Sequence, residues 1–228
     1  MRYLLDTVNI QDIRVDMDIF PIAGITSNPS IVKTEGKIDF FRHMRKIRSL
    51  IGMQNSFHIQ VTRDNVEGIL KDADTILNRV DDQVYIKVPV TVEGIKAIRL
   101  LKQQGVHVTA TAIYGKSQAF LALEAGADYL APYYNRMENM GLSPDEVISS
   151  IAAMIEQYHY HSEILAASFK NAGQVERAFE AGAQTATVSP SILSEALEQP
   201  YILHAVEVFE NDWKDIYGDK SISELEGC

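Results

Sequence analysis

The feature that most constrains the fold is a regular alternation of short apolar runs with amphipathic stretches of helical period. Eight runs of apolar and β-branched residues occur in the 228 residues, and a helical pattern or a turn-and-helix pattern follows each one. This alternation favours a parallel sheet, and eight such units can close as a barrel. We therefore expect an α/β protein with a single-domain (β/α)₈ TIM barrel. The apolar runs are residues 3–7, 20–26, 56–61, 84–90, 106–112, 127–132, 163–168 and 184–188.

An open, doubly wound sheet is the alternative that the same alternation allows. Such a sheet needs a glycine-rich phosphate loop after its first strand, and the segment Leu4–Asn9 has no glycine. Thr91 is placed to cap the helix at 92–104, and Ser143 with Pro144 begins another helix in the manner of a capping box. The other expected helices are 8–18, 38–51, 64–80, 116–125, 174–181 and 191–198.

A further amphipathic helix, which a barrel does not need for closure, runs from Pro200 to Tyr217. Apolar residues recur along it at helical spacing, among them Val206, Phe209 and Trp213. We expect residues 1–199 to form the barrel and residues 200–228 to form a C-terminal helix and tail. The helix lies across its own barrel or docks on a neighbouring subunit, and the residues alone leave both arrangements open.

Composition and charge limit the classes of partner. Hydrophobic residues make up 46% and charged residues 23% of the chain, which is ordinary for a globular protein. The net charge of −10 argues against nucleic acid and against anionic membrane surfaces as partners. An anionic small molecule is still possible, because a site can be locally basic on an acidic protein.

The lack of a recognisable signal peptide or membrane span, together with a single cysteine, favours a cytoplasmic protein. Residues Met1–Asp6 contain no apolar run of the length of a signal peptide, and no stretch approaches the length of a membrane span. The single cysteine is Cys228, so we expect neither an internal disulfide nor a cysteine-metal cluster.

One lysine, Lys87, stands in the middle of the fourth apolar run, two residues before Pro89. Lysine is rarely buried without a partner or a task, and burial lowers its pKa. At its usual pKa of about 10.4, only about one molecule in a few thousand is neutral at pH 7. A desolvated lysine escapes that limit and can attack a carbonyl carbon to form a Schiff base. The other interpretation is a lysine that reaches from a strand end to water, and this strand alone does not separate the two.

Polar residues recur where the expected strands end, which is where a (β/α)₈ barrel builds its active site. Each has an ordinary explanation by itself: Asp6 as a helix cap, Asn28 as a turn residue, Ser168 as a satisfied hydroxyl. Together a carboxylate, amides, an amine and a phenol at one mouth indicate a site. The set comprises Asp6, Thr26, Asn28, Gln60, Lys87, Thr111, Tyr133, Asn135, Arg136, Ser168 and Lys170.

Schiff-base chemistry suggests a role for most members of this set. Lys87 is the candidate nucleophile, and Asp6 can exchange protons and stabilise the iminium. Tyr133, Gln60 and Thr111 can hold a water that moves protons at the carbon being cleaved. The amide of Asn28 and the Ser168 hydroxyl suit sugar hydroxyls, and Arg136 with Ser168 suits an anion such as phosphate.

Metal-dependent aldol chemistry needs a cluster of histidines or carboxylates instead. The chain has six histidines, spread from His43 to His204, and the pair in His159-Tyr160-His161 is expected at a solvated helix end. We therefore expect no metal.

Three segments resemble the transaldolase family, and more narrowly its small fructose-6-phosphate aldolase and transaldolase-like subfamily. They are Gly24–Ser30, Tyr85–Pro89 and Leu165–Lys170, and the resemblance extends in order along nearly the whole chain. It implies a class I mechanism on Lys87 without a cofactor, acting on sugar phosphates or on simpler ketones and aldehydes. It also implies homo-oligomers, ring-shaped pentamers stacked into decamers, with the C-terminal helix reaching a neighbour.

Gln60 and Tyr133 separate the two branches of the family. Transaldolases carry a glutamate and a phenylalanine at these positions, so the chain is similar to the aldolase branch at both. Lys170 replaces a second arginine found in transaldolases, and Ser27 and Tyr134 are smaller departures. Three hypotheses remain: reversible cleavage of fructose 6-phosphate, transfer of a dihydroxyacetone unit as in transaldolase, and a phosphosugar-binding protein without catalysis.

Overall fold

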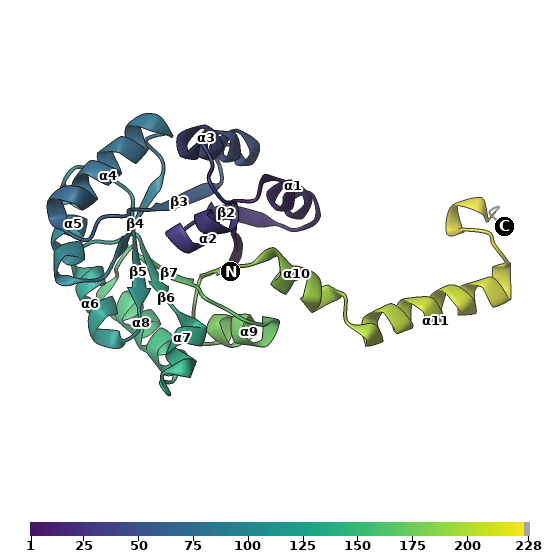
Figure 1. The fold of residues 1–228 in the computed structure, drawn as a ribbon. Helices are drawn as coiled ribbons and strands as arrows, with labels where there is room; N and C mark the ends of the chain where they lie inside the picture. The colour runs from purple at the N-terminus through teal and green to yellow at the C-terminus, as the bar shows by residue number, and fades with distance from the viewer. Residues whose placement is uncertain (226–228) are drawn as a thin grey trace. The chain divides into compact units, whose positions relative to one another are not determined.

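The computed structural model describes residues 1–225, so Cys228 lies outside the described residues (Figure 1). The chain divides into two compact units, one of residues 1–190 and one that begins at Ser191.

The first unit is a closed barrel of parallel strands, which confirms the expected (β/α)₈ fold. Each strand pairs with the next along the chain, and β8 pairs with β1 to close the sheet. This closure excludes the open, doubly wound alternative. The strands are β1 (Arg2–Asp6), β2 (Ile22–Thr26), β3 (Ser56–Gln60), β4 (Tyr85–Pro89), β5 (Val108–Ile113), β6 (Tyr129–Pro132), β7 (Glu163–Ala166) and β8 (Thr185–Val188).

Helices surround the strands in Figure 1. Two short ones, α2 and α7, were not expected from the sequence, and both stand directly after a strand. The helices of this unit are α1 (Ile10–Ile19), α2 (Pro29–Thr34), α3 (Phe40–Ile51), α4 (Val66–Arg79), α5 (Val92–Gln103), α6 (Lys116–Glu124), α7 (Tyr134–Asn139), α8 (Pro144–Tyr158) and α9 (Ala172–Glu180).

Most strand residues are buried because the barrel covers both faces of each strand. Phe57, Ile86, Val88 and Leu130 are completely buried. Polar residues stand at both ends of the strands, with Arg2 at the amino end of β1 and Asp6 at its carboxyl end. The register places Lys87 of β4 beside Gln60 of β3.

Helix ends follow the expected capping pattern. Thr91 accepts a hydrogen bond from the amide of Gly94 at 3.0 Å and caps α5, as predicted. The Ser143 hydroxyl accepts one from the amide of Glu146 at 3.4 Å at the start of α8. Caps of this kind stabilise a helix by about 1 kcal/mol.

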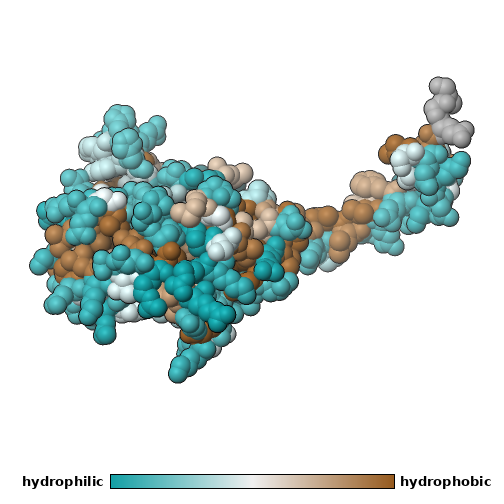
Figure 2. Space-filling view, turned by 90° about the horizontal axis from the view of Figure 1, so that it is seen from above, coloured by the Kyte–Doolittle hydropathy of each residue, from teal (hydrophilic) through white to brown (hydrophobic). Residues whose placement is uncertain are grey.

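The second unit holds α10 (Pro190–Leu197), most of which belongs to it, and α11 (Pro200–Tyr217). The α11 bounds are those expected from the sequence. No residue of α11 is buried, although Tyr201, Phe209 and Ile216 are apolar and about 70% exposed. Figure 2 shows apolar side chains along the surface of this helix. Among the described residues, no helix has the length and apolar character to cross a membrane.

Candidate active site

A cavity of about 280 Å³ opens at the carboxyl ends of the strands. Side chains from six strand ends or the loops after them reach it, including the Lys87 amine. This is the face of the barrel on which (β/α)₈ enzymes build active sites. The lining residues are Asp6, Asn28, Pro29, Ser30, Gln60, Lys87, Tyr133, Arg136, Ala167 and Ser168.

Lys87 and Asp6 form the charged centre of this cavity. The Lys87 side chain is almost entirely buried, with the residue 2% exposed. Burial lowers the pKa of the Lys87 amine below its usual range, and the nearby Asp6 carboxylate opposes this effect. Burial likewise raises the pKa of the Asp6 carboxyl, against the influence of Lys87 and of a hydrogen bond from Thr26. Both groups are therefore shifted toward the pH range in which they exchange protons.

Two buried threonines fix the Asp6 carboxyl. The Thr26 hydroxyl donates to Asp6 Oδ1 at 2.6 Å, and its oxygen lies 2.6 Å from the hydroxyl oxygen of Thr187 on β8. Because the single Thr26 proton goes to the carboxylate, the Thr187 hydroxyl acts as donor to Thr26. The orientation of Asp6 is thus set by a chain that crosses from β8 to β2.

A second polar group shares the cavity with Lys87: Gln60 of β3 and Tyr133 line it, and Thr111 of β5 is bonded to Tyr133. The Thr111 hydroxyl donates to the Tyr133 hydroxyl at 3.1 Å, and burial raises the pKa of the Tyr133 phenol, which keeps it protonated. Gln60 Oε1 is buried and accepts no hydrogen bond from the residues that the structure describes. An amide oxygen in this state requires a donor from a ligand or a water. Tyr133, Thr111 and Gln60 can therefore hold a water beside the substrate.

His58 lies below Lys87 in the barrel interior and is completely buried. Its Nδ1 is 2.8 Å from the Thr109 hydroxyl, and its Nε2 is 3.0 Å from the Ser56 hydroxyl. Burial, with the positive charge of Lys87 as the next cause, holds the pKa of His58 well below its usual range. His58 is therefore a neutral, hydrogen-bonded residue of the barrel interior next to Lys87. Within residues 1–225, no group of three or more His, Cys, Asp or Glu residues is arranged to hold a metal ion.

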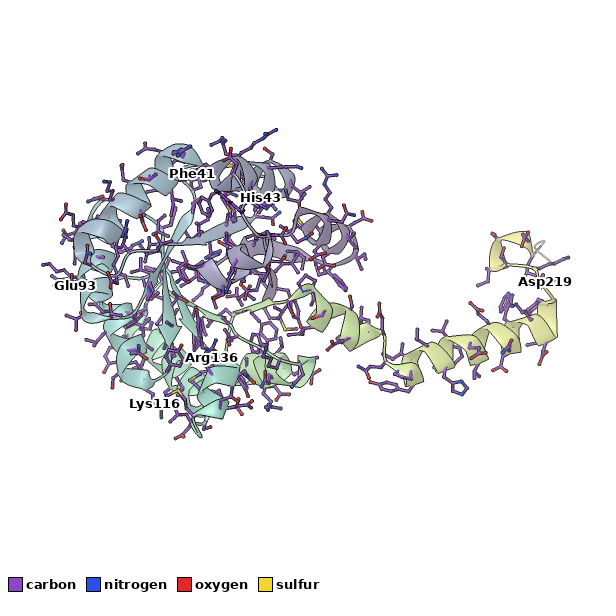
Figure 3. The ribbon with its side chains drawn as sticks, in the orientation of Figure 1. Phe41, His43, Glu93, Lys116, Arg136 and Asp219 are labelled. Carbon is purple, nitrogen blue, oxygen red and sulfur yellow. The ribbon has the colours of Figure 1, made fainter. Side chains whose placement is uncertain are left out.

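The segments that follow β2, β6 and β7 present groups that suit an anion. Arg136, labelled in Figure 3, stands on α7 and lines the cavity. Ser168 follows β7 with φ of 63°, a left-handed conformation that costs a residue with a Cβ about 1 kcal/mol or more. Asn28 lines the cavity, and its side-chain oxygen accepts from the amide of Ile31 at 3.0 Å, which caps α2.

Four of the predicted site residues do not line the cavity. Thr26 and Thr111 stand one hydrogen bond behind it, on Asp6 and Tyr133. Asn135 and Lys170 are bonded to Gln174 of α9, Asn135 through its side-chain oxygen and Lys170 through its backbone amide. The structure therefore brings the other seven predicted residues together around the cavity.

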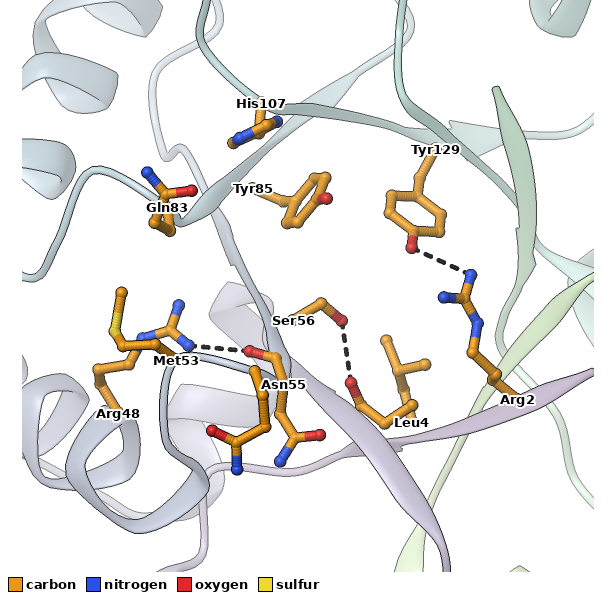
Figure 4. Close-up of a pocket in the computed structure, with 12 residues that line it drawn as sticks. Arg2, Leu4, Arg48, Met53, Asn55, Ser56, Gln83, Tyr85, His107 and Tyr129 are labelled. Carbon is orange, nitrogen blue, oxygen red and sulfur yellow. Dashed lines mark hydrogen bonds between the residues drawn. The ribbon is translucent and has the colours of Figure 1, made fainter. Parts of the chain in front are cut away.

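A second cavity, of about 330 Å³, lies at the amino ends of the strands (Figure 4). It contains two arginines, but both are already neutralised: Arg2 pairs with Glu163, and Arg48 pairs with Asp81 at 2.7 Å. Its three rings contact one another: Tyr85 lies 4.9 Å from His107 in a tilted arrangement and 5.1 Å from Tyr129 edge-on, measured between ring centroids. This end of a barrel contributes stability, and the candidate site is the cavity around Lys87.

Comparison with known proteins decides the family. Residues 3–222 match the model of the family described as Transaldolase/Fructose-6-phosphate aldolase. The chain is also 48% identical over 222 residues to a protein of Streptococcus pneumoniae (strain ATCC 700669 / Spain 23F-1) named "Probable fructose-6-phosphate aldolase", covering 97% of this chain and 100% of that protein. The chain belongs to the transaldolase/fructose-6-phosphate aldolase family. This confirms the resemblance seen in the three sequence segments.

Sequence reasoning missed some residues at the site of this family member. Thr187 is the next-to-last residue of β8, and its hydroxyl is bonded to Thr26 of the Asp6 network. The same signal, a polar residue at the carboxyl end of an apolar run, identifies it. Ser30 and Pro29 line the cavity from the first turn of α2, and the Asn28-Pro29 pair is the sequence signal for that helix.

Proposed function

We propose that the protein is a class I aldolase that reversibly cleaves fructose 6-phosphate into dihydroxyacetone and glyceraldehyde 3-phosphate, with Lys87 as the Schiff-base nucleophile. The observation that carries this proposal is a buried lysine of lowered pKa that shares a cavity with a carboxyl of raised pKa. A depressed pKa supplies the neutral amine that attacks a ketone. The family membership and the name of the Streptococcus pneumoniae relative support the same chemistry.

The first half of the reaction makes the imine. The neutral Lys87 amine attacks C2 of the ketose, and the carbonyl oxygen takes a proton to give a carbinolamine. Asp6 donates the proton that lets this hydroxyl leave as water, and the resulting carboxylate stabilises the iminium. The hydrogen bond from Thr26 keeps the Asp6 oxygen in one orientation during both steps.

The second half breaks and releases the carbon chain. A water held by Gln60, Thr111 and Tyr133 removes the proton of the C4 hydroxyl, the bond between C3 and C4 breaks, and its electron pair moves into the enamine. Glyceraldehyde 3-phosphate leaves. The enamine carbon then takes a proton, and water hydrolyses the iminium to free dihydroxyacetone and the Lys87 amine.

The anion of the substrate belongs beside Arg136 and Ser168. A guanidinium matches the geometry of phosphate oxygens, and the Ser168 hydroxyl adds a donor. Asn28 suits a sugar hydroxyl at the cavity wall. Lys170 contributes positive charge from the adjoining loop.

Transaldolase is the second candidate, because the family includes both activities. A transaldolase shares every step up to the enamine. Its enamine then attacks an acceptor aldehyde, whereas the enamine of an aldolase takes up a proton. Gln60 and Tyr133 favour the aldolase, since a phenol bonded to Thr111 can deliver the proton that releases the ketone.

Product analysis separates these candidates. Fructose 6-phosphate is supplied with and without erythrose 4-phosphate, and free dihydroxyacetone is measured. An aldolase releases dihydroxyacetone without an acceptor. If no free dihydroxyacetone forms in the sample without erythrose 4-phosphate, the aldolase assignment is wrong. If neither condition yields product, the remaining hypothesis is a phosphosugar-binding protein without catalysis.

The proposal includes assembly and location. We infer a cytoplasmic homo-oligomer, a pentamer or a decamer, in which residues 200–228 dock on a neighbouring subunit. Support comes from α11, where no residue is buried and large apolar side chains are exposed. A helix with such a surface gains stability by covering it against another protein surface.

A further inference from the structure

Two glutamines hold loops of the barrel in the same way. Gln118 Oε1 accepts from the amide of Tyr114 at 2.9 Å, and Gln174 Oε1 accepts from the amide of Lys170 at 2.7 Å. In each case the glutamine stands four residues after the amide. One loop joins β5 to α6 and the other joins β7 to α9.

Each segment also contains one residue in the left-handed conformation. Ala112 has φ of 57° and Ser168 has φ of 63°, and each precedes the held amide by two residues. Residues with a Cβ adopt this conformation only where the surroundings enforce it. Ala112 is the next-to-last residue of β5 and Ser168 follows β7, so the two segments share a left-handed residue and a glutamine that fixes the amide two residues after it.

The amino groups of the two glutamines differ in what they bind. Gln118 Nε2 donates to backbone carbonyls within its own part of the barrel, Val90 O at 3.0 Å and Ala112 O at 3.3 Å. Gln174 Nε2 donates instead to side chains of α7, Asn135 Oδ1 at 3.1 Å and Glu138 Oε2. Gln174 thus ties α7, which carries Arg136, to the loop that carries Ser168.

The orientation of these amides follows from the partners. The Lys170 amide can only donate, so it requires Gln174 Oε1, and the Glu138 carboxylate can only accept, so it requires Gln174 Nε2. Asn135 must then present its oxygen to Gln174. These assignments are mutually consistent, and Gln174 is 3% exposed, so the arrangement is held away from competing water.

A second set of bonds fixes α7 from the same helix. Arg177 Nε donates to the Tyr134 hydroxyl at 3.0 Å, and Arg177 Nη2 donates to Glu138 Oε1 at 3.1 Å. Tyr134 is completely buried and donates to Asp145 of α8, and its pKa is raised to about 12, chiefly by burial. The α7 helix is therefore held by both α8 and α9.

Backbone hydrogen bonds from the Tyr134 amide to Ala167 O at 2.8 Å and from the Asn135 amide to Ser168 O at 3.0 Å already join the start of α7 to the loop bearing Ser168. We propose that Gln174, which does not line the cavity, is a positioning residue for its anion-binding side, because its bonds to Asn135 and Glu138 fix the α7 turn bearing Arg136 relative to that loop. The nature of the anion, the phosphate of a sugar phosphate, rests on the proposed function. A guanidinium binds phosphate through two directed hydrogen bonds, so a shift of about 1 Å in its helix weakens binding strongly.

The test compares Gln174→Met with Gln118→Met in the full chain. Methionine keeps the length of the side chain but removes its donor and acceptor. Each protein is assayed for addition of dihydroxyacetone to glyceraldehyde 3-phosphate and to unphosphorylated glyceraldehyde. Gln174→Met is expected to raise KM for the phosphorylated acceptor about tenfold or more. Its kcat and its kinetics with glyceraldehyde stay within about twofold of the parent protein.

Gln118→Met is the matched control, because it loses the same loop contact away from the anion-binding side. It is expected to lower the thermal midpoint by a similar amount and to affect both acceptors alike. An equal rise of KM for both acceptors in Gln174→Met overturns the proposal, as does an unchanged KM for glyceraldehyde 3-phosphate.

Calorimetric titration with inorganic phosphate keeps this result separate from the proposed function. If the parent protein makes no aldol product, the proposed function fails, and the titration alone decides the role of Gln174. Weaker phosphate binding in Gln174→Met, by about tenfold, with unchanged binding in Gln118→Met, supports the positioning role. Equal phosphate affinity in all three proteins overturns it.

Discussion

Lys87 and Asp6 each have a pKa shifted by burial, and each reduces the shift of the other. A free lysine is neutral in about one molecule in a few thousand at pH 7, and each unit by which its pKa falls multiplies that fraction about tenfold. The raised pKa of Asp6 serves the opposite purpose, since it keeps a proton available for the carbinolamine. One buried pair therefore supplies both the nucleophile and the acid.

The Asp6 shift predicts a pH-dependent stability that is clearest without Lys87. In Lys87→Met the Asp6 carboxyl remains buried, so its folded-state pKa stays above the usual 3.8. The folded state then binds this proton more tightly than the unfolded state. The resulting stability is present below about pH 4 and is lost as pH rises through the folded-state pKa.

Urea unfolding of Lys87→Met and of Lys87→Met/Asp6→Asn between about pH 4 and 8 measures this effect. The single variant should lose stability relative to the double variant by about 1.4 kcal/mol for each unit by which the pKa is raised. Parallel stability curves for the two proteins would show that Asp6 is not desolvated.

The role of Tyr133 in releasing dihydroxyacetone from the enamine can be tested by removing its hydroxyl. Tyr133→Phe removes the hydroxyl that Thr111 binds at 3.1 Å, and with it one support of the proton-carrying water. Release of free dihydroxyacetone should fall about 10²-fold, in the range for loss of a general acid–base group. Imine formation at Lys87 should persist, as measured by mass spectrometry after reduction. Unchanged release of dihydroxyacetone contradicts the assignment.

At the scale of elements, the position of Lys87 depends on how closely α5 packs on the end of β4. A Cβ on Gly94 would lie 2.0 Å from the carbonyl oxygen of Pro89, which is backbone and cannot move aside. The glycine therefore allows an approach that no other residue permits.

Gly94→Ala should destabilise the protein by about 1–3 kcal/mol or more, the usual range for overpacking. Gly115→Ala is the control, because a Cβ there meets nothing within 4 Å and its φ is −164°. Thermal unfolding of the two variants tests the difference. Equal midpoints would mean that α5 shifts without cost.

The elements with a strong periodic signal were predictable, and the short ones were not. The apolar run around Lys87 and the helix Pro200–Tyr217 stand where the pattern indicates. The six-residue α7 has no side-chain cap at Tyr133 and too few turns to show a period, so tertiary bonds to α8 and α9 define it. Ser168 looked like the end of a strand, but β7 ends at Ala166 and the backbone then turns left-handed.

In the candidate site, too, some residues were predictable from the sequence and others were not. Strand ends converge on one mouth by topology, so the sequence alone selected Lys87, Asp6 and Gln60 for the same cavity. Side-chain orientation depends on tertiary contacts that no pattern encodes. For this reason Asn135, expected at the substrate, was found bonded to Gln174.

At the scale of the whole molecule, the exposed apolar surface of α11 leads to a prediction about subunit assembly. Truncation after Gln199 removes the exposed apolar side chains of α11. If α11 docks on a neighbouring subunit as proposed, the particle mass measured by light scattering should fall below that of the full-length protein by more than the mass of the deleted residues. Truncation after Gly218 keeps α11 and should keep the mass. A full-size particle after the larger truncation would remove the docking role.

The central claim is that Lys87 forms a covalent imine with the ketose. The protein is treated with fructose 6-phosphate and sodium borohydride, digested, and analysed by mass spectrometry, with Lys87→Ala and substrate-free samples as controls. The account predicts a reduced dihydroxyacetone or hexose adduct on the peptide containing Lys87, an unmodified Lys87→Ala protein that remains folded, and loss of at least about 10³-fold in its activity. An adduct on another lysine, or full activity in a folded Lys87→Ala protein, would contradict it.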